Sequence, residues 1–230
     1  MTSKNCLNCE KELTDKFCSG CGQKADTHRI TFRHFIAHDV LHGTFHLEKG
    51  ILFTAKQALI RPGQAALDYI SGKRKRFYNV FYLILLTIGV MLFTRNIGDY
   101  FYGESEEIVS EKVYLNEASK KMDELFSQKS KIILFLFVPL AALNSFLLFR
   151  RKKLNLSEHF ILSGMILLGL LLLSTFTNLL FPFVNYFISG TIASLFVTAI
   201  LIFYVCFAYY NSFSTIYTKP GITLRIVLFY

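Results

Sequence analysis

Four cysteines near the N-terminus have the type and spacing of metal ligands. They form two Cys-x-x-Cys pairs, Cys6 with Cys9 and Cys18 with Cys21, and eight residues separate the pairs. Each pair can present two thiolates to one ion, and four sulfur ligands suit tetrahedral zinc. Because four thiolates leave no open coordination position, we expect a structural zinc ion. The alternative, two disulfides, would require an oxidising compartment.

The segment that carries these cysteines is too short to fold around an apolar core. A stretch of roughly 20 residues buries little surface, so a bound metal would have to supply its folding free energy. Residues 16–24, with the sequence KFCSGCGQK, resemble the small zinc-ribbon family. The resemblance implies that residues 1–26 form a zinc ribbon that serves as an interaction module or a structural cap.

A histidine-rich segment follows, in which histidines recur at every fourth position from His34 to His46. On a helix this spacing places neighbours on one face, so His34, His38 and His42 could form a second metal site with Asp39 as an oxygen ligand. A pH-responsive element is another interpretation. The ordinary interpretation is a helix at the membrane surface, because apolar residues interleave with the histidines.

The rest of the chain is dominated by apolar runs. Hydrophobic residues make up 53% of the sequence, and the mean hydropathy is +0.40. An 18-residue helix is about 27 Å long, which is enough for the hydrocarbon core of a bilayer. We predict an all-α polytopic membrane protein, residues 77–230, with spans at about 77–94, 132–149, 160–180 and 191–213. A partial apolar run, 222–230, either starts a fifth span or lies in the interface.

Two basic clusters stand beside these apolar runs, and they carry much of the net charge of +9. Their position favours a topology signal over a nucleic-acid-binding face, and the positive-inside rule places the N-terminus in the cytoplasm. A second interpretation is binding of anionic lipid headgroups, at about 1 kcal/mol per charge. The first basic cluster contains Lys73, Arg74, Lys75 and Arg76, and the second contains Arg150, Arg151, Lys152 and Lys153.

The predicted spans contain no Asp, Glu, Lys, Arg or His. Ionisable groups inside a membrane usually mark ion or proton pathways. Their absence from the predicted spans argues against an ion-coupled transporter and against acid–base chemistry within the membrane.

The segment between the head and the first span, residues 27–76, is predicted to form helices at the cytoplasmic membrane surface. The last part of this segment, together with Phe77, the first residue of the first predicted span, forms a stretch that we call the collar. It comprises residues 61–77, with the sequence RPGQAALDYISGKRKRF. Together with the Cys-x-x-Cys head and the following YNVF, the collar resembles the bacterial membrane protein family catalogued as domain of unknown function 3667. The resemblance implies an integral membrane protein and no particular reaction. Where that family's motif would have a proline after Asn79, this chain has Val80. The matching motif residues are Arg61, Pro62, Gly63, Tyr69, Gly72, Lys73, Arg74, Arg76 and Tyr78.

These patterns favour a non-enzymatic adaptor or assembly protein, in which the zinc ribbon binds a protein partner and the helices anchor it among membrane lipids. One alternative is a small-molecule or lipid transporter, or a subunit of one. A second alternative is a membrane metalloenzyme that uses the histidine segment. We expect no nucleic-acid partner.

Overall fold

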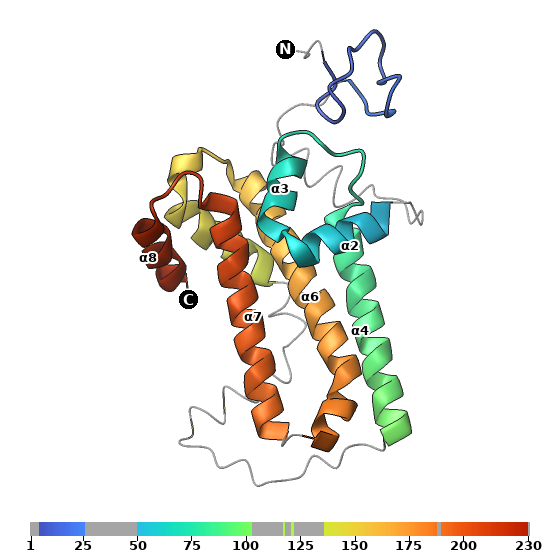
Figure 1. The fold of residues 1–230 in the computed structure, drawn as a ribbon, viewed down its shortest axis with the longest axis vertical. Coiled ribbons are helices and arrows are strands. Elements are labelled where there is room, and N and C mark those ends of the chain that lie inside the picture. The colour runs from blue at the N-terminus through green and yellow to red at the C-terminus, as the bar shows by residue number, and fades with distance from the viewer. Residues whose placement is uncertain are drawn as a thin grey trace.

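The structure, a computed structural model, describes residues 5–25, 50–102, 117, 121, 136–187 and 190–229. Within these ranges the chain is mostly helical, and its only β-structure is two isolated bridges, Asn5 with Glu12 and Phe17 with Lys24. The small head, residues 5–25, lies beyond one end of a helical bundle (Figure 1). The expectation of a helical fold with a cysteine-bearing head is confirmed.

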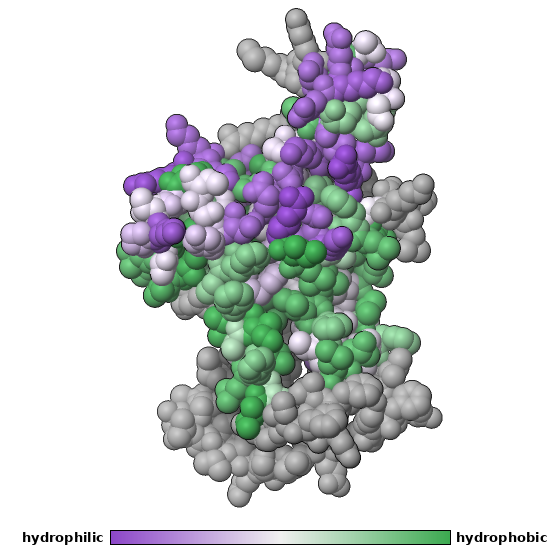
Figure 2. Space-filling view, viewed as in Figure 1, coloured by the Kyte–Doolittle hydropathy of each residue, from purple (hydrophilic) through white to green (hydrophobic). Residues whose placement is uncertain are grey.

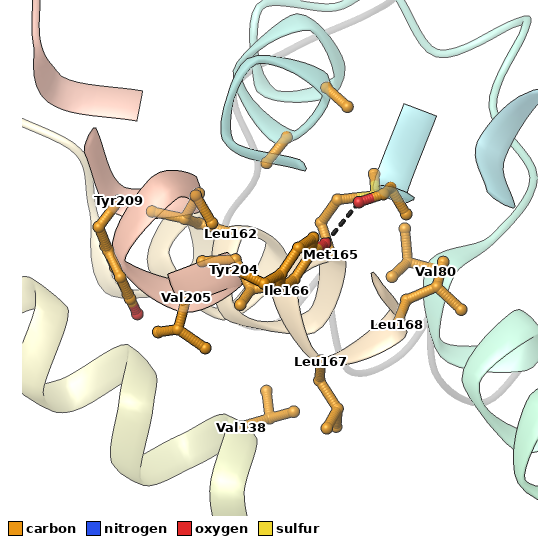
Figure 3. Packing of buried hydrophobic residues seen from close by; sticks show 14 of the residues in the cluster. Val80, Val138, Leu162, Met165, Ile166, Leu167, Leu168, Tyr204, Val205 and Tyr209 are labelled. Atoms are coloured by element: carbon orange, nitrogen blue, oxygen red, sulfur yellow. Dashed lines mark hydrogen bonds between the residues drawn. The ribbon is translucent and has the colours of Figure 1, made fainter. Parts of the chain in front are cut away.

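The bundle is built around one long helix, α6 (Leu156–Phe187). It packs against α4 (Val80–Tyr102) on one side and α7 (Gly190–Phe213) on another, and all three run along the long axis of the molecule (Figure 1). A shorter apolar helix, Leu136–Leu148, contributes Val138 to the same core. Figure 3 shows Leu162, Met165 and Ile166 of α6 gathered with the side chains of Val205 and Tyr209 of α7.

Two short helices, α2 (Gly50–Ile60) and α3 (Pro62–Ile70), cover the end of α6 and α7 nearest the head (Figure 1). The Tyr204 hydroxyl of α7 donates to the carbonyl of Ala58 over 2.5 Å (dashed line in Figure 3). The amide of Gln64 donates to Asn211 Oδ1 over 3.0 Å. These contacts join helices that are far apart in the sequence, so the end of the bundle is tied across its width.

Gly63 is what allows α3 to approach α7 so closely. A Cβ atom at this position would lie 2.1 Å from Ser212 Oγ and 2.4 Å from the carbonyl oxygen of Ala208. Pro62 precedes it at the start of α3, where a proline costs no helical hydrogen bond. The Pro-Gly pair of the collar therefore starts α3 and seats it on α7.

Two short elements complete the described fold. η2 (Arg150–Lys152) lies between the helix Leu136–Leu148 and α6, and α8 (Lys219–Phe229) follows α7. In α8, Ile222 and Ile226 are buried, and the Phe229 ring packs against Tyr209 at a centroid distance of 4.5 Å. Asn144 Nδ2 donates to the carbonyl of Phe229 over 3.1 Å. Most of the partial apolar run predicted at 222–230 is thus a short helix packed on the bundle.

Two helices are long and apolar enough to cross a membrane by length and composition, Leu156–Leu180 and Ile192–Phe213. They correspond to the third and fourth predicted spans. The apolar helices at the first two predicted spans are shorter, Val80–Thr94 and Leu136–Leu148. The predicted total of four membrane-spanning helices is therefore not shown.

Helix caps explain why two helices begin away from their predicted starts. α4 begins at Val80 because Asn79 caps it, with Asn79 Oδ1 accepting from the amide of Phe81 over 3.0 Å. Val80 takes the first helical position, which proline often occupies. The start of this helix is therefore set by the asparagine, without the proline of the family motif.

α6 begins at Leu156, earlier than the predicted residue 160, because Asn155 and Glu158 form a capping box. The amide of Asn155 donates to Glu158 Oε2 over 2.7 Å, and the amide of Glu158 donates to Asn155 Oδ1 over 2.8 Å. The candidate span consequently includes Glu158 and His159, both buried. The predicted span, 160–180, excluded these two residues, so the argument against ion-coupled transport does not extend to the whole candidate span. The predicted span ended at residue 180, whereas α6 continues through Pro182 to Phe187.

Replacing Gly63 with alanine tests the close approach of α3 to α7. We expect Gly63→Ala to lower the free energy of unfolding by about 1–3 kcal/mol, since the new methyl group meets backbone atoms that cannot move aside easily. The measurement is thermal unfolding of the detergent-purified chain, followed by circular dichroism. Gly89→Ala in α4 is the matched control, because a Cβ there has no neighbour within 4 Å. Equal midpoints for the two variants would contradict this role for Gly63.

Candidate metal centre

The structure brings all four head cysteines to one point. Cys6 Sγ lies 3.6 Å from Cys21 Sγ, and Cys9 Sγ lies 3.5 Å from Cys18 Sγ. All four sulfurs lie within 4.8 Å of one another. Tetrahedral ligation with bonds of about 2.3 Å separates sulfurs by about 3.8 Å, whereas a disulfide needs about 2.05 Å. The cysteines are free, and their arrangement fits one metal ion.

The two Cys-x-x-Cys turns share one backbone design. In the first turn, the amide of Cys6 donates to the carbonyl of Lys11 and the amide of Glu10 donates to the carbonyl of Cys6, both over 2.8 Å. The second turn has both bonds twelve positions later. The amide of Cys18 donates to the carbonyl of Gln23, and the amide of Gly22 donates to the carbonyl of Cys18, again over 2.8 Å. Each turn therefore holds its two sulfurs by local hydrogen bonds, and the two turns face each other across the sulfur cluster.

Each turn ends in a residue with left-handed backbone geometry. Glu10 has φ 63°, and Gly22, at the equivalent place, has φ 71°. Gly20 lies within the second turn, where a Cβ would lie 2.9 Å from the side chain of Lys11 and in ordinary van der Waals contact with the sulfurs of Cys9 and Cys18.

Backbone amides prepare Cys18 to act as a thiolate. The amides of Cys21 and Gly20 point at its sulfur and lower the pKa of Cys18 to about 6, and Gly20 N lies 3.4 Å from Cys18 Sγ. At Cys9 the Lys11 amide lowers the pKa, but the neighbouring Cys18 sulfur and burial outweigh it, and the pKa rises to about 12. One negative sulfur thus opposes ionisation of the next, and a cation among the four sulfurs would remove that conflict.

The head is docked on the collar through Gln23, two residues after the last cysteine. Gln23 Nε2 donates to the carbonyl of Gly72 over 2.8 Å. Its Oε1 accepts from the amides of Arg74 and Lys75, each over 3.3 Å. Gln23 is only 6% exposed, so this amide replaces water for three backbone groups of the collar. Its position fixes how the head sits on the bundle.

Gly72 completes this contact. Its φ is +105°, a conformation that disfavours other residues, and a Cβ there would lie 2.6 Å from the side chain of Leu7. The glycine turn of the collar therefore also makes room for Leu7 of the head. Gly72 is one of the residues on which the family resemblance rests, and the structure gives it a physical purpose.

The second basic cluster, residues 150–153, is largely engaged within the bundle. Lys152 Nζ donates to the carbonyl of Ser212 over 3.0 Å and lies over the Phe213 ring, 5.7 Å from its centroid. Burial lowers the pKa of Lys152. Arg151 lies over the Tyr217 ring at 5.3 Å. Cations here meet the C-terminal end of α7, where backbone carbonyls carry partial negative charge.

The histidine segment, including His34, His38 and His42, lies outside the described residues. The second metal site proposed there stays a prediction. Among the described residues, the four cysteines are the one group of His, Cys, Asp or Glu side chains placed to share a metal ion.

Sequence reasoning missed a buried polar group on α6. His159 is 1% exposed, and its Nδ1 lies 2.9 Å from Ser145 Oγ on the helix Leu136–Leu148. Within the described residues, His159 Nε2 and Ser163 Oγ have no hydrogen-bond partner. The Asn-x-x-Glu capping pattern at residues 155–158 was the signal that would have moved the helix start forward and revealed this histidine.

The metal site can be tested by elemental analysis of the purified full-length chain. We expect one divalent metal ion per wild-type chain and almost none in Cys18→Ser, because three thiolates and a hydroxyl bind such an ion far more weakly. Cys206→Ser is the matched control, since Cys206 lies in α7, away from the cluster. Metal that survives Cys18→Ser, or that is lost equally from both variants, would contradict the assignment.

Docking through Gln23 can be tested by hydrogen exchange. Gln23→Ala removes the acceptor of the Arg74 and Lys75 amides, so we expect these two amides to exchange roughly tenfold to hundredfold faster. Ser19→Ala, at an exposed position of the head, is the control and should leave both rates unchanged. Unchanged rates in Gln23→Ala would mean that the head is held by other contacts.

Comparison with known proteins gives one match. A search of curated proteins and a search of solved structures each found no match. Residues 48–92 match the family model described as Protein of unknown function (DUF3667). The match covers α2, α3, the rest of the collar and the apolar start of α4. The part of the chain that resembles this family is therefore the platform on which the cysteine-bearing head is docked.

Proposed function

We propose that this chain is a multi-pass membrane adaptor, in which a zinc-stabilised head presents a binding surface for a protein partner at the cytoplasmic face of a bacterial inner membrane. The observation that carries the proposal is the docked head. Gln23 and Leu7 hold it against the collar, so its outer face has a fixed orientation relative to the bundle. A metal site with four cysteine ligands would leave no open ligand position, which favours a non-enzymatic assembly role.

The proposal of four spans draws support from the direction of the helices. α4 and α6 start at the collar end, and Leu136–Leu148 and α7 finish there, with Phe149 stacked on Phe213 at 4.2 Å. This alternation is what four successive crossings would produce. It holds for the two shorter apolar helices as well as for the two longer ones.

The surface of the bundle supports membrane insertion. Hydrophilic residues gather over the head and the adjoining end, while the long helices below are hydrophobic (Figure 2). The shorter apolar helices expose large side chains, with Phe93 at 65% and Leu140 at 62%. Contiguous apolar surface of this kind is rare on soluble monomers and suits contact with lipid.

The orientation is supported by the place of the two basic clusters. Lys152 of the second cluster binds the carbonyl of Ser212, and Gln64 of the collar binds the neighbouring Asn211. Both clusters therefore lie at the same end of the bundle as the head. The positive-inside rule assigns this end to the cytoplasm, where a reducing environment keeps thiolates available for zinc.

The head exposes a large aromatic side chain that a protein partner could contact. Phe17, in the loop between the two Cys-x-x-Cys turns, is 60% exposed, an unusual position for a large aromatic side chain. Aromatic residues are enriched where proteins bind one another. Zinc would hold this loop in place because Cys18 follows Phe17 directly.

The adaptor proposal can be tested by crosslinking in membranes followed by purification of the full-length chain. We expect a defined set of proteins to co-purify with the wild type and with Cys206→Ser, and to be lost with Cys18→Ser and with Phe17→Ala. Phe17→Ala should retain its metal, which separates loss of a contact from loss of the folded head. If both head variants retained every partner, the head would not be the binding surface, and the proposal would fail.

A further inference from the structure

A cavity of about 250 Å³ lies where the head, α2, α3 and the first basic cluster meet. Three cationic side chains line it, Arg61 and two members of the first basic cluster, Lys73 and Arg76. Asp68 is the one carboxylate on its wall, which leaves two positive charges in excess. Pockets for drug-sized ligands measure roughly 300–1,000 Å³, so this cavity suits a smaller group that carries negative charge.

The cationic side chains of this cavity differ in how far they are already paired. Asp68 carboxylate oxygens lie 3.6 Å from Arg61 Nη2 and 3.4 Å from Lys73 Nζ. Gln57 also accepts from Arg61. For Arg76 we find no hydrogen bond or ion pair from its side chain within the described ranges. Asp68 thus holds two cations on the wall, while the Arg76 guanidinium has no such partner among the described residues.

The walls of the cavity are fixed before any ligand arrives. The amide of Tyr78 donates to Thr54 Oγ1 over 2.8 Å, which ties the end of the collar to α2. At the start of α2, Gly50 sits so close to the collar that a Cβ would lie 3.0 Å from the carbonyl oxygen of Arg76. The backbone that carries Arg76 is therefore held in place, and a ligand would lose less free energy to ordering of the site.

One side of the cavity is apolar. Phe53 of α2 and Phe77 of the collar line it, and their rings meet edge to face with centroids 5.2 Å apart. Phe77 directly precedes the segment that leads into α4, so this wall lies at the edge of the proposed membrane region. Amide side chains from Asn8 of the head and Gln64 of α3 complete the polar side. A cavity with polar donors on one side and an apolar wall on the other suits a ligand in which a negatively charged group is attached to an apolar or uncharged part.

The second basic cluster provides a contrast within the same molecule. Lys152 is committed to the end of α7, and Arg151 packs on Tyr217. The first basic cluster lines the cavity, whereas Lys152 and Arg151 of the second cluster are engaged by a carbonyl oxygen and by aromatic rings.

We propose that this cavity binds a phosphate group, with Arg76 as its principal donor and Lys73 and Arg61 as supporting cations. Arginine presents two parallel N–H groups to a phosphate, and such charge-assisted bonds are about twice as strong as neutral ones. The group belongs either to an anionic phospholipid headgroup at the membrane surface or to a soluble phosphate. This site is independent of the protein partner proposed for the head.

Titration calorimetry on the full-length chain in a nonionic detergent tests the site with two probes, dihexanoyl phosphatidylglycerol and inorganic phosphate. We expect the wild type to bind at least one probe, and Arg76→Gln to weaken that binding about tenfold or more. Binding of phosphatidylglycerol alone assigns the site to a lipid headgroup. Binding of inorganic phosphate as well assigns it to the phosphate group itself.

Arg150→Gln is the matched control, because it removes the same charge from the second basic cluster and should change the affinity less than twofold. Arg76→Lys keeps the charge and should recover part of the affinity. Lys73→Gln provides a second variant on the cavity wall, so that the result does not depend on the folding of one mutant. Absence of binding by the wild type to both probes, or equal weakening by Arg76→Gln and Arg150→Gln, would overturn the proposal.

Discussion

The close seating of α2 and α3 on the end of α6 and α7 is the constraint on which the other features depend. Tyr204 reaches from α7 to the carbonyl of Ala58, and Gly63 lets α3 lie against the backbone of α7. A Cβ at Gly169 would overlap the Tyr204 hydroxyl, so α6 must also be narrow at this point. The collar crosses this closed end, and the amide of Tyr78 directly after it is held by Thr54 of α2. The collar carries the first basic cluster and binds the head through Gln23.

The parts of this molecule that sequence reasoning predicted well are those whose geometry is local. The cysteine spacing was enough, because each Cys-x-x-Cys turn builds its half of the site from hydrogen bonds within six residues. Apolar runs identified the long helices for the same reason. Their starts were less accurate, since hydropathy does not register a cap. Asn79 and the Asn155–Glu158 pair decide where α4 and α6 begin.

Long-range contacts were beyond what the sequence alone could reveal. Nothing in the pattern around Gln23 indicates that its amide will meet a loop 49 to 52 positions later. Equal charge also does not reveal that the two basic clusters make different contacts. The two basic clusters look alike in the sequence, yet Lys152 caps the end of a helix and Arg76 lines a cavity. Such differences arise only when distant helices are brought together, because they depend on which carbonyls and rings a cation meets.

The bond from Gln23 to the collar also has a thermodynamic consequence. Gln23 closes the second Cys-x-x-Cys turn, since its carbonyl accepts from the amide of Cys18, and its side chain holds the collar. Metal binding and docking therefore share one residue and are coupled. Coupling of this kind is reciprocal: whatever factor metal adds to docking, docking adds to metal affinity. On the proposal that the four cysteines bind zinc, the bundle would act as a distant part of the metal site, and the cysteines of the isolated head would hold the ion less tightly than those of the whole chain.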